Sequence, residues 1–221
     1  MLLLAVVVVL NLIGLVMVLS ASSVTALHQE GTSYYYFERQ LIWLAIGSVA
    51  FVLALRANLQ RLRLLAWPLL IATFGLLVVV LLPGIGSNVN GSSRWIGVGM
   101  FTIQPSEFAK LAMLIFGADL LARRAAWIDD TRVTLRPVMV AFCALALLIM
   151  LQPNLGTTIV LAAITFSILF VAGVPLRPLV GWGAAGTAVA CVAAMGQSYR
   201  RARILAFLHP WNDPLNTGYQ T

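Results

Sequence analysis

Long apolar runs alternate with short polar stretches along the whole chain. Reading between the charged residues gives seven runs that approach the ~20 helical residues needed to cross a bilayer. The runs cover about residues 1–20, 37–55, 64–83, 105–122, 137–152, 157–174 and 178–196. This pattern predicts an all-α polytopic membrane protein with seven transmembrane helices.

Composition supports the membrane assignment. Hydrophobic residues make up 61% of the 221 residues, charged residues make up 10%, and the mean hydropathy is +0.97. Because a soluble domain carries roughly 25% charged residues, these values exclude an ordinary soluble domain and a disordered chain. Cys143 and Cys191 lie within apolar runs, and His28 and His209 form no ligand pair. We therefore expect neither a disulfide scaffold nor a protein-bound structural metal.

The basic residues predict the direction of insertion. The formal net charge is +7, but the cations are scattered between apolar runs, which does not favour nucleic acid as a partner. Arginine and lysine concentrate in cytoplasmic loops. With a cytoplasmic N-terminus, the first six loops place two arginines, Arg39 and Arg94, on the outer side. They place eight on the inner side: Arg56, Arg61, Arg63, Arg123, Arg124, Arg132, Arg136 and Arg177.

This bias predicts a cytoplasmic N-terminus, so residues 197–221 begin an outer loop. That loop stops without closing, and no internal repeat or linker interrupts the chain. We expect one membrane domain over residues 1–221 that is cut short.

The outer loop before the fourth span holds Arg94 and Trp95 after a run of small residues. One interpretation is an interfacial tryptophan anchor beside an arginine. The other is a site for an anionic headgroup, in which Arg94 donates to phosphate and Trp95 packs against lipid or sugar.

The fourth span begins with a charged pair. Pro105 suits the first turn of a helix, and the helix dipole favours Glu107 there. Lys110 follows on the same face, where an ammonium costs ~2.5–3.5 kcal/mol on insertion scales unless it is paired or hydrated. The pair either faces a water-filled cavity with a function or is purely structural. Asp119 and Arg123, four residues apart at the other end, indicate a structural pair.

Two more polar stretches lie on the predicted outer side. Gln152 and Asn154 are amides close to membrane depth. They either hydrogen-bond a substrate sugar or satisfy backbone groups that the turn leaves free. Arg200, Arg201 and Arg203 form either an amphipathic surface helix or a cationic rim around a diphosphate.

Seven short motifs, taken in order, resemble the SEDS family (shape, elongation, division and sporulation) of polytopic peptidoglycan glycosyltransferases. They are VLSAS at 18–22, PGIG at 83–86, GSSRWI at 91–96, QPSEFAKLA at 104–112, QPNLGT at 152–157, YRRAR at 199–203 and PWNDPLNTGYQ at 210–220. The resemblance covers nearly the whole chain. The loop motifs are more similar to the division branch of the family than to its elongation branch.

The resemblance implies a ten-span fold, of which three spans are absent here, in the bacterial cytoplasmic membrane. It implies lipid II as the substrate, polymerised on the outer face at the division septum. It also implies a class B penicillin-binding protein transpeptidase and other divisome membrane proteins as partners. The family's proposed catalytic aspartate lies in the large outer loop, beyond Thr221. The catalytic residue is therefore unknown, Asp213 is no substitute for it, and we expect the chain alone to be inactive.

Position and resemblance together give the expected substrate-binding residues. They are Arg94, Trp95, Glu107, Lys110, Gln152, Asn154, Arg200 and Arg201. The family commonly has aspartate where this chain has Asn154, so a charge is missing there. The leaving polyprenyl diphosphate needs fixed cations or a divalent metal. No visible motif binds a cofactor, and the chemistry is compatible with Mg²⁺ or Mn²⁺.

Two other functions fit the same residues. A lipid II flippase or transporter also uses intramembrane charged pairs and broken helices. A non-catalytic membrane scaffold for a division transpeptidase would need none of these residues for chemistry.

Overall fold

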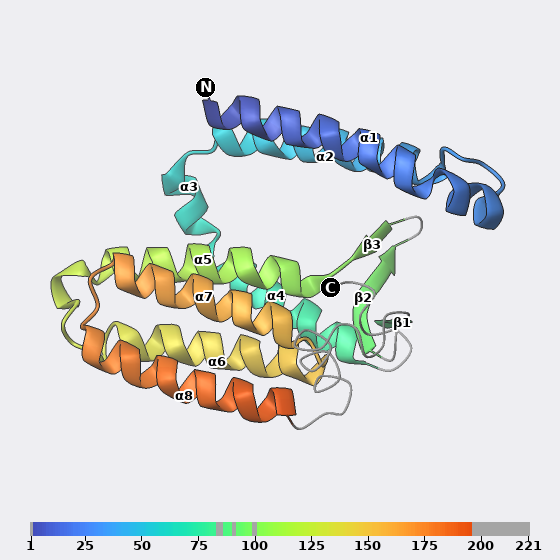
Figure 1. Cartoon of the computed structure of the whole chain (residues 1–221). Coiled ribbons are helices and arrows are strands. Elements are labelled where there is room, and N and C mark those ends of the chain that lie inside the picture. The colour runs from blue at the N-terminus through green and yellow to red at the C-terminus, as the bar shows by residue number, and fades with distance from the viewer. Residues whose placement is uncertain (1, 83–85, 90–91, 99–100, 196–221) are drawn as a thin grey trace. The chain divides into compact units, whose positions relative to one another are not determined.

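The computed structural model describes residues 2–82, 86–89, 92–98 and 101–195 (Figure 1). The described elements are α1 (Leu2–Glu30), α2 (Tyr35–Leu55), α3 (Leu59–Leu64), α4 (Ala66–Leu81), β1 (Gly86–Val89), β2 (Ser92–Val98), β3 (Phe101–Ile103), α5 (Pro105–Arg123), the short 3₁₀ helix η1 (Ala125–Trp127), α6 (Leu135–Leu151), α7 (Leu155–Val171) and α8 (Leu176–Met195). Each of the seven predicted spans coincides with a helix. The all-α prediction is therefore confirmed.

The helices differ in how well they meet the length of a membrane span. Within the described residues, three are long and apolar enough to cross a membrane: Leu2–His28, Tyr35–Leu55 and Leu176–Ala193. Helices α4, α6 and α7 are apolar but shorter, at 16 or 17 residues, close to the lower limit for a span. Helix α5 has 19 residues and carries charged side chains at both ends.

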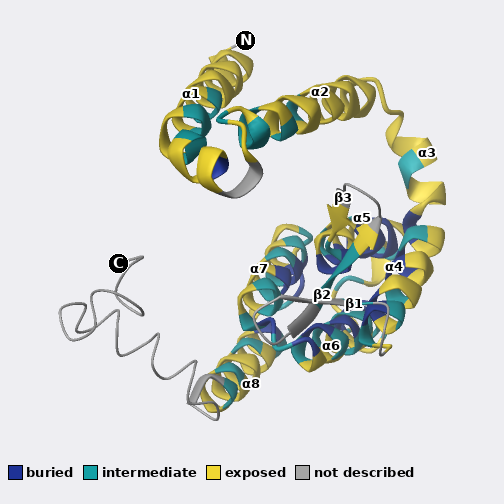
Figure 2. Ribbon diagram, turned by 90° about the vertical axis from the view of Figure 1, so that its right-hand side faces the viewer, coloured by how far each residue is buried: buried dark blue, intermediate teal, exposed yellow. Residues whose placement is uncertain are grey.

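The chain divides into two compact units, Met1–Leu59 and Gln60–Thr221. In the first unit, α1 and α2 pack against each other. Gly31 follows α1 with a φ of +77°, a conformation that glycine adopts without strain. Most side chains of this unit are exposed and apolar, as lipid-facing helices require (Figure 2). The prediction of one membrane domain stays a prediction.

The core of the second unit lies where α4, α5, α6 and α7 face one another (Figure 2). Its largest fully buried apolar side chains are Leu77, Met113, Leu145, Ile149, Leu161 and Leu169. Helix α5 contacts both α4 and α7, while α8 packs on α7. Gly173, with a φ of +85°, ends α7, and Val174 then donates its N–H back to the carbonyl of Leu169.

A small antiparallel sheet in the order β1-β2-β3 joins α4 to α5. Ile96 on β2 pairs with Gly86 on one side and with Ile103 on the other. The sequence indicated a loop here, because Gly and Ser dominate its first half. The β-branched and aromatic residues that follow favour a strand once the ends of α4 and α5 provide a surface.

The second unit has two distinct ends. The strand end comprises the sheet, the start of α5 and the α6–α7 turn at 152–154. The η1 end comprises α3, η1 and the last turns of α5 and α7. Both are visible in Figure 1, at opposite ends of the bundle.

Candidate functional site

Arg94 ties the sheet to the α6–α7 turn at the strand end. Its Nε donates to the carbonyl oxygen of Gln152 at 2.9 Å, and its Nη2 donates to that of Pro153 at 2.7 Å. The last carbonyls of a helix have no partner within the helix. Arg94 therefore satisfies backbone acceptors that follow the end of α6, from a strand nearly 60 residues earlier in the chain.

Gln152 is buried and makes a hydrogen bond to another helix. Its side chain is 1% exposed, and its Nε2 donates to the carbonyl oxygen of Leu77 on α4 at 3.4 Å. Its Oε1 is buried and has no partner among the described residues. This geometry supports the interpretation that the amide satisfies backbone groups, while its role toward a sugar stays a prediction.

Asn154 is the N-cap of α7. Its Oδ1 accepts from the backbone N–H of Thr157 at 3.3 Å, and its carbonyl accepts from the hydroxyl of Thr158 at 3.0 Å. An N-cap side chain satisfies one of the N–H groups that the first turn of a helix leaves free. Asn154 is 9% exposed, so most of its surface packs within the turn.

Glu107 and Lys110 form the predicted ion pair in the first turns of α5. The Lys110 Nζ lies 2.7 Å from the Glu107 Oε2, and the two side chains are 26% and 55% exposed. Pro105 occupies the first turn of α5. Gln104, the residue before the helix, donates from its Nε2 to the Oγ of Ser106 in that turn at 2.9 Å. The pair is confirmed as a contact. It is accessible from outside the bundle, which leaves room for a ligand.

The other predicted site residues are less well placed. Trp95 follows Arg94 on β2 and is half-buried. Successive side chains of a strand point to opposite faces, so the two do not act on one surface. Arg200 and Arg201 lie outside the described residues. The contacts bring Arg94, Gln152 and Asn154 together, whereas Glu107 and Lys110 form a separate pair at the same end.

Carboxylates are sparse at the strand end. Among the described acidic residues of the second unit, Glu107 lies there, whereas Asp119, Asp129 and Asp130 lie toward η1. No group of three or more His, Cys, Asp or Glu side chains that could hold a metal ion occurs within the described ranges.

The η1 end carries a different ion-pair arrangement. Asp119 is 5% exposed and contacts Arg123 at 2.9 Å, as predicted, and also Arg63 on α3 at 2.8 Å. Arg123 Nε donates to both carboxylate oxygens. The sequence did not reveal Arg63 as a partner, because 56 residues separate it from Asp119. The only available signal was a basic residue in a short polar stretch.

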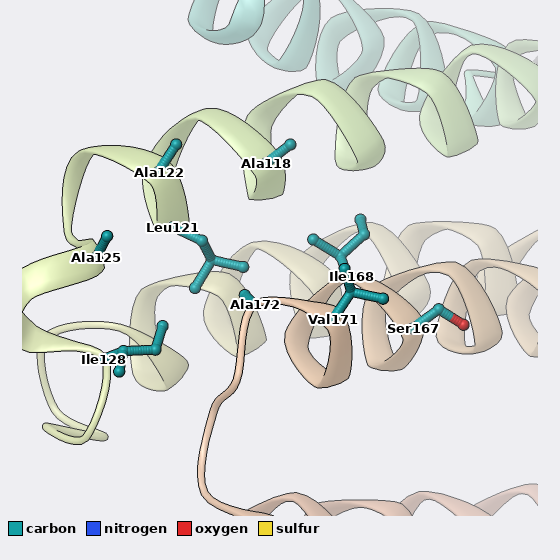
Figure 3. Close-up of a pocket in the computed structure, with 9 residues that line it drawn as sticks. All are labelled: Ala118, Leu121, Ala122, Ala125, Ile128, Ser167, Ile168, Val171 and Ala172. Carbon is teal, nitrogen blue, oxygen red and sulfur yellow. The ribbon is translucent and has the colours of Figure 1, made fainter.

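A pocket of about 470 Å³ opens between the ends of α5 and α7 near η1 (Figure 3). Apart from the Ser167 hydroxyl, its lining is apolar: Ala118, Leu121, Ala122, Ala125, Ile128, Ile168, Val171 and Ala172. A large pocket is the usual first candidate for a binding site. This one contains none of the predicted site residues and offers no acid, base or cation, so we place the candidate site at the strand end.

Comparison with known proteins agrees with the motifs. A family model described as "Cell cycle protein", covering FtsW, RodA and SpoVE, matches residues 1–221. The probable peptidoglycan glycosyltransferase FtsW of Pseudomonas fluorescens is 38% identical over 208 residues, which are 94% of this chain and 51% of that protein. Stage V sporulation protein E of Bacillus subtilis is 39% identical over 94% of this chain and 57% of its own length. The chain spans about half the length of these relatives.

Two solved structures are also similar. One is described as "Structural coordination of polymerization and crosslinking by a peptidoglycan synthase complex". It has a TM-score of 0.69 at 32% identity and covers 94% of this chain and 62% of that chain. The crystal structure of the rod shape determining protein RodA of Thermus thermophilus has a TM-score of 0.59 at 28% identity, covering 81% and 58%. Given these matches and its apolar helices, the chain is a multi-pass membrane protein and belongs to the SEDS family of FtsW, RodA and SpoVE.

Proposed function

We propose that the full-length protein is a peptidoglycan glycosyltransferase that polymerises lipid II into glycan strands during septal cell-wall synthesis. Relatives named as peptidoglycan glycosyltransferases match over at least 94% of this chain, which supports the activity. The observation in this chain that carries the proposal is the accessible Glu107–Lys110 pair. An ammonium within a membrane helix is costly and marks a functional position by default.

In this proposal Lys110 supplies the cation that the reaction needs beside the leaving group. The acceptor hydroxyl attacks the anomeric carbon of the donor sugar and loses its proton to a carboxylate base. The bond to the polyprenyl diphosphate breaks, and the departing oxygen gains negative charge that fixed donors stabilise. An ammonium has three N–H donors, so Lys110 keeps two for a phosphate oxygen while Glu107 holds the third.

The remaining site residues have supporting roles in this proposal. Gln152 and Asn154 shape the groove from the α6–α7 turn, Trp95 packs against lipid or sugar from the opposite face of β2, and Arg200 and Arg201 add cations to the rim. The base comes from the large outer loop that the family resemblance implies beyond Thr221. A divalent cation such as Mg²⁺ or Mn²⁺ would supply further charge neutralisation, which chelation during the assay tests.

Location and partners follow from charge and from the relatives. We propose that the strand end faces outward at the division septum and that the N-terminus is cytoplasmic, because arginines concentrate at the opposite end. One similar structure combines polymerization and crosslinking in a single complex. This supports a class B penicillin-binding protein transpeptidase as the partner, alongside other divisome membrane proteins.

The test is polymerisation of purified lipid II by the full-length protein together with a catalytically inactive transpeptidase partner. Wild type is compared with Lys110→Ala, and Arg177→Ala, an exposed cation at the start of α8, serves as the matched control. We expect glycan chains from wild type and from the Arg177 variant, and none from a folded, partner-bound Lys110 variant.

Other outcomes would favour other functions. No chains from wild type, with lipid II still crossing liposome membranes, would favour the transporter. Neither chains nor transport, with division supported by the Lys110 variant in cells, would favour the scaffold. Chains from the Lys110 variant would keep the enzyme but make the Glu107–Lys110 pair structural.

A further inference from the structure

We propose that Arg94 is a positioning residue that sets the α6–α7 turn, rather than a direct ligand of the diphosphate. The consequence for catalysis rests on the proposed function. The mechanical part does not, because it concerns contacts that exist without substrate. It replaces the sequence-based expectation that Arg94 donates to phosphate.

The turn depends on few hydrogen bonds of its own. The N–H groups of Gln152 and Asn154 both donate to the carbonyl of Ile149, at 3.1 and 3.3 Å. Two consecutive carbonyls of the turn, those of Gln152 and Pro153, accept from Arg94. Unsatisfied backbone groups near membrane depth are strongly unfavourable, because no water is there to replace the missing partner. A single side chain thus satisfies two consecutive acceptors in non-helical backbone.

The choice of arginine fits this task. A guanidinium presents its donors in a planar, rigid fork, whereas a lysine ammonium is a point charge on a flexible stem. The two distances, 2.9 and 2.7 Å, show that both arms of the fork are used. Arginine opposite the carbonyl end of α6 is also favoured by the helix dipole.

The turn also carries two polar side chains, those of Gln152 and Asn154. Asn154 caps the first turn of α7 through the N–H of Thr157, and Gln152 anchors the other side to α4. With Arg94 in place, the backbone between these two amides is held from β2. Without it, two carbonyls lose their donors and Asn154 loses the fixed backbone that aims its side chain. Arg94 therefore acts on the proposed site through the backbone that carries Gln152 and Asn154.

The test separates the charge of Arg94 from its fork geometry. Arg94→Lys keeps the positive charge but cannot span both carbonyls. In the substrate-free full-length protein, hydrogen exchange at the amides of residues 154–158 should rise about tenfold. Exchange within the middle of α5 should stay unchanged. Arg177→Lys, the matched control, should leave both segments as in wild type.

Kinetics provide the second readout. If Arg94 positions the turn, Arg94→Lys lowers kcat about tenfold with little change in the KM for lipid II. If it binds diphosphate directly, KM rises, exchange stays at the wild-type level, and the retained charge of lysine preserves much of the activity. Wild-type exchange in a folded Arg94→Lys protein would overturn the proposal.

Arg94→Gln provides a second variant if the lysine variant fails to fold. It lacks the charge and, like lysine, cannot reproduce the fork, so raised exchange at 154–158 is again expected, and unchanged exchange would overturn the proposal. Raised exchange in a protein whose wild type makes no glycan would leave the positioning role intact while the proposed function fails.

Discussion

Helix α5 carries an arrangement of ion pairs at each end. The two arrangements differ in burial and in the number of partners that each charged group has. Near η1, the Asp119 carboxylate is 5% exposed and is held by two arginines from different helices. At the strand end, Glu107 and Lys110 contact each other and are 55% and 26% exposed. The first arrangement has satisfied its buried charge with protein donors. In the second arrangement the Lys110 ammonium still has N–H donors for a ligand.

This contrast separates two uses of charge in an apolar protein. A buried carboxylate must be paired, because desolvation costs more than one contact returns. Arg63 and Arg123 meet that requirement and join α3 to α5. An accessible pair contributes little to stability, typically 0–1 kcal/mol, so Lys110 needs another reason to lie in a membrane helix. The following variants test whether one pair is catalytic and the other structural.

The largest effect is expected for Lys110→Ala on catalysis. Removing one fixed donor from a developing negative charge typically costs 10²–10³ in kcat, about 2.7–4 kcal/mol. Stability should change by less than about 1 kcal/mol, because the pair is accessible. Glycan synthesis and detergent denaturation of the same preparation measure the two effects.

Exchanging the charges sharpens this result. A protein with Glu107→Lys and Lys110→Glu keeps a pair on the same face but moves the ammonium by about 4.5 Å along the helix axis. Activity near the wild-type level in the exchanged protein would show that the pair is structural.

The next effect concerns stability at the other end. Arg63→Ala and Arg123→Ala should each cost about 1 kcal/mol, because Asp119 keeps one partner. Together they should cost about 3 kcal/mol, since a buried charge is then unpaired. Denaturation of both single variants and the double variant gives the coupling energy. Purely additive losses would contradict a shared buried carboxylate.

A smaller change is expected at the α6–α7 turn. Asn154→Ala removes the N-cap of α7 and should destabilise the protein by about 1 kcal/mol. Asn154→Asp keeps the acceptor oxygen, and the helix dipole favours its charge, so stability should stay near wild type. If aspartate proved as damaging as alanine in the same denaturation experiment, the cap would not explain this residue.

The smallest effect is expected at a buried group with no partner. Thr73 on α4 is 1% exposed, and its hydroxyl has no hydrogen-bond partner among the described residues. Thr73→Val removes the hydroxyl at nearly constant volume. It should be neutral or stabilising by up to about 1 kcal/mol. A clear loss of stability on denaturation would indicate that the hydroxyl has a partner such as a buried water.

Local features were well predicted from the chain. The apolar runs located the seven long helices of the described residues, because a helix in lipid satisfies its own backbone and needs only enough apolar residues. The Glu107–Lys110 and Asp119–Arg123 pairs were predicted for a similar reason. Side chains three or four residues apart on a helix are neighbours whatever the rest of the fold does.

Contacts between distant segments were not predicted. The sheet was missed because β1 begins with Gly86 and β2 with Ser92, residues that indicated a loop, and pairing partners determine strand formation more than propensity does. For Arg94 the sequence left open an interfacial position beside a tryptophan anchor or a site for an anionic headgroup, and nothing along the chain indicated its contacts with the carbonyls of Gln152 and Pro153. The span predicted at about residues 1–20 lies in α1, and polar residues continue this helix to Glu30.

The sequence by itself therefore determined the membrane class, the helices, the charged pairs within α5 and, through its motifs, the family. These follow from periodicity and from interactions over a few residues. Only the tertiary structure decided that Arg63 completes the Asp119 site and that Arg94 donates to the turn after α6. Both contacts depend on how α3, β2 and α6 pack, because the packing decides which carbonyl and carboxylate oxygens an arginine can reach. The positions of these residues along the chain do not reveal which oxygens those are.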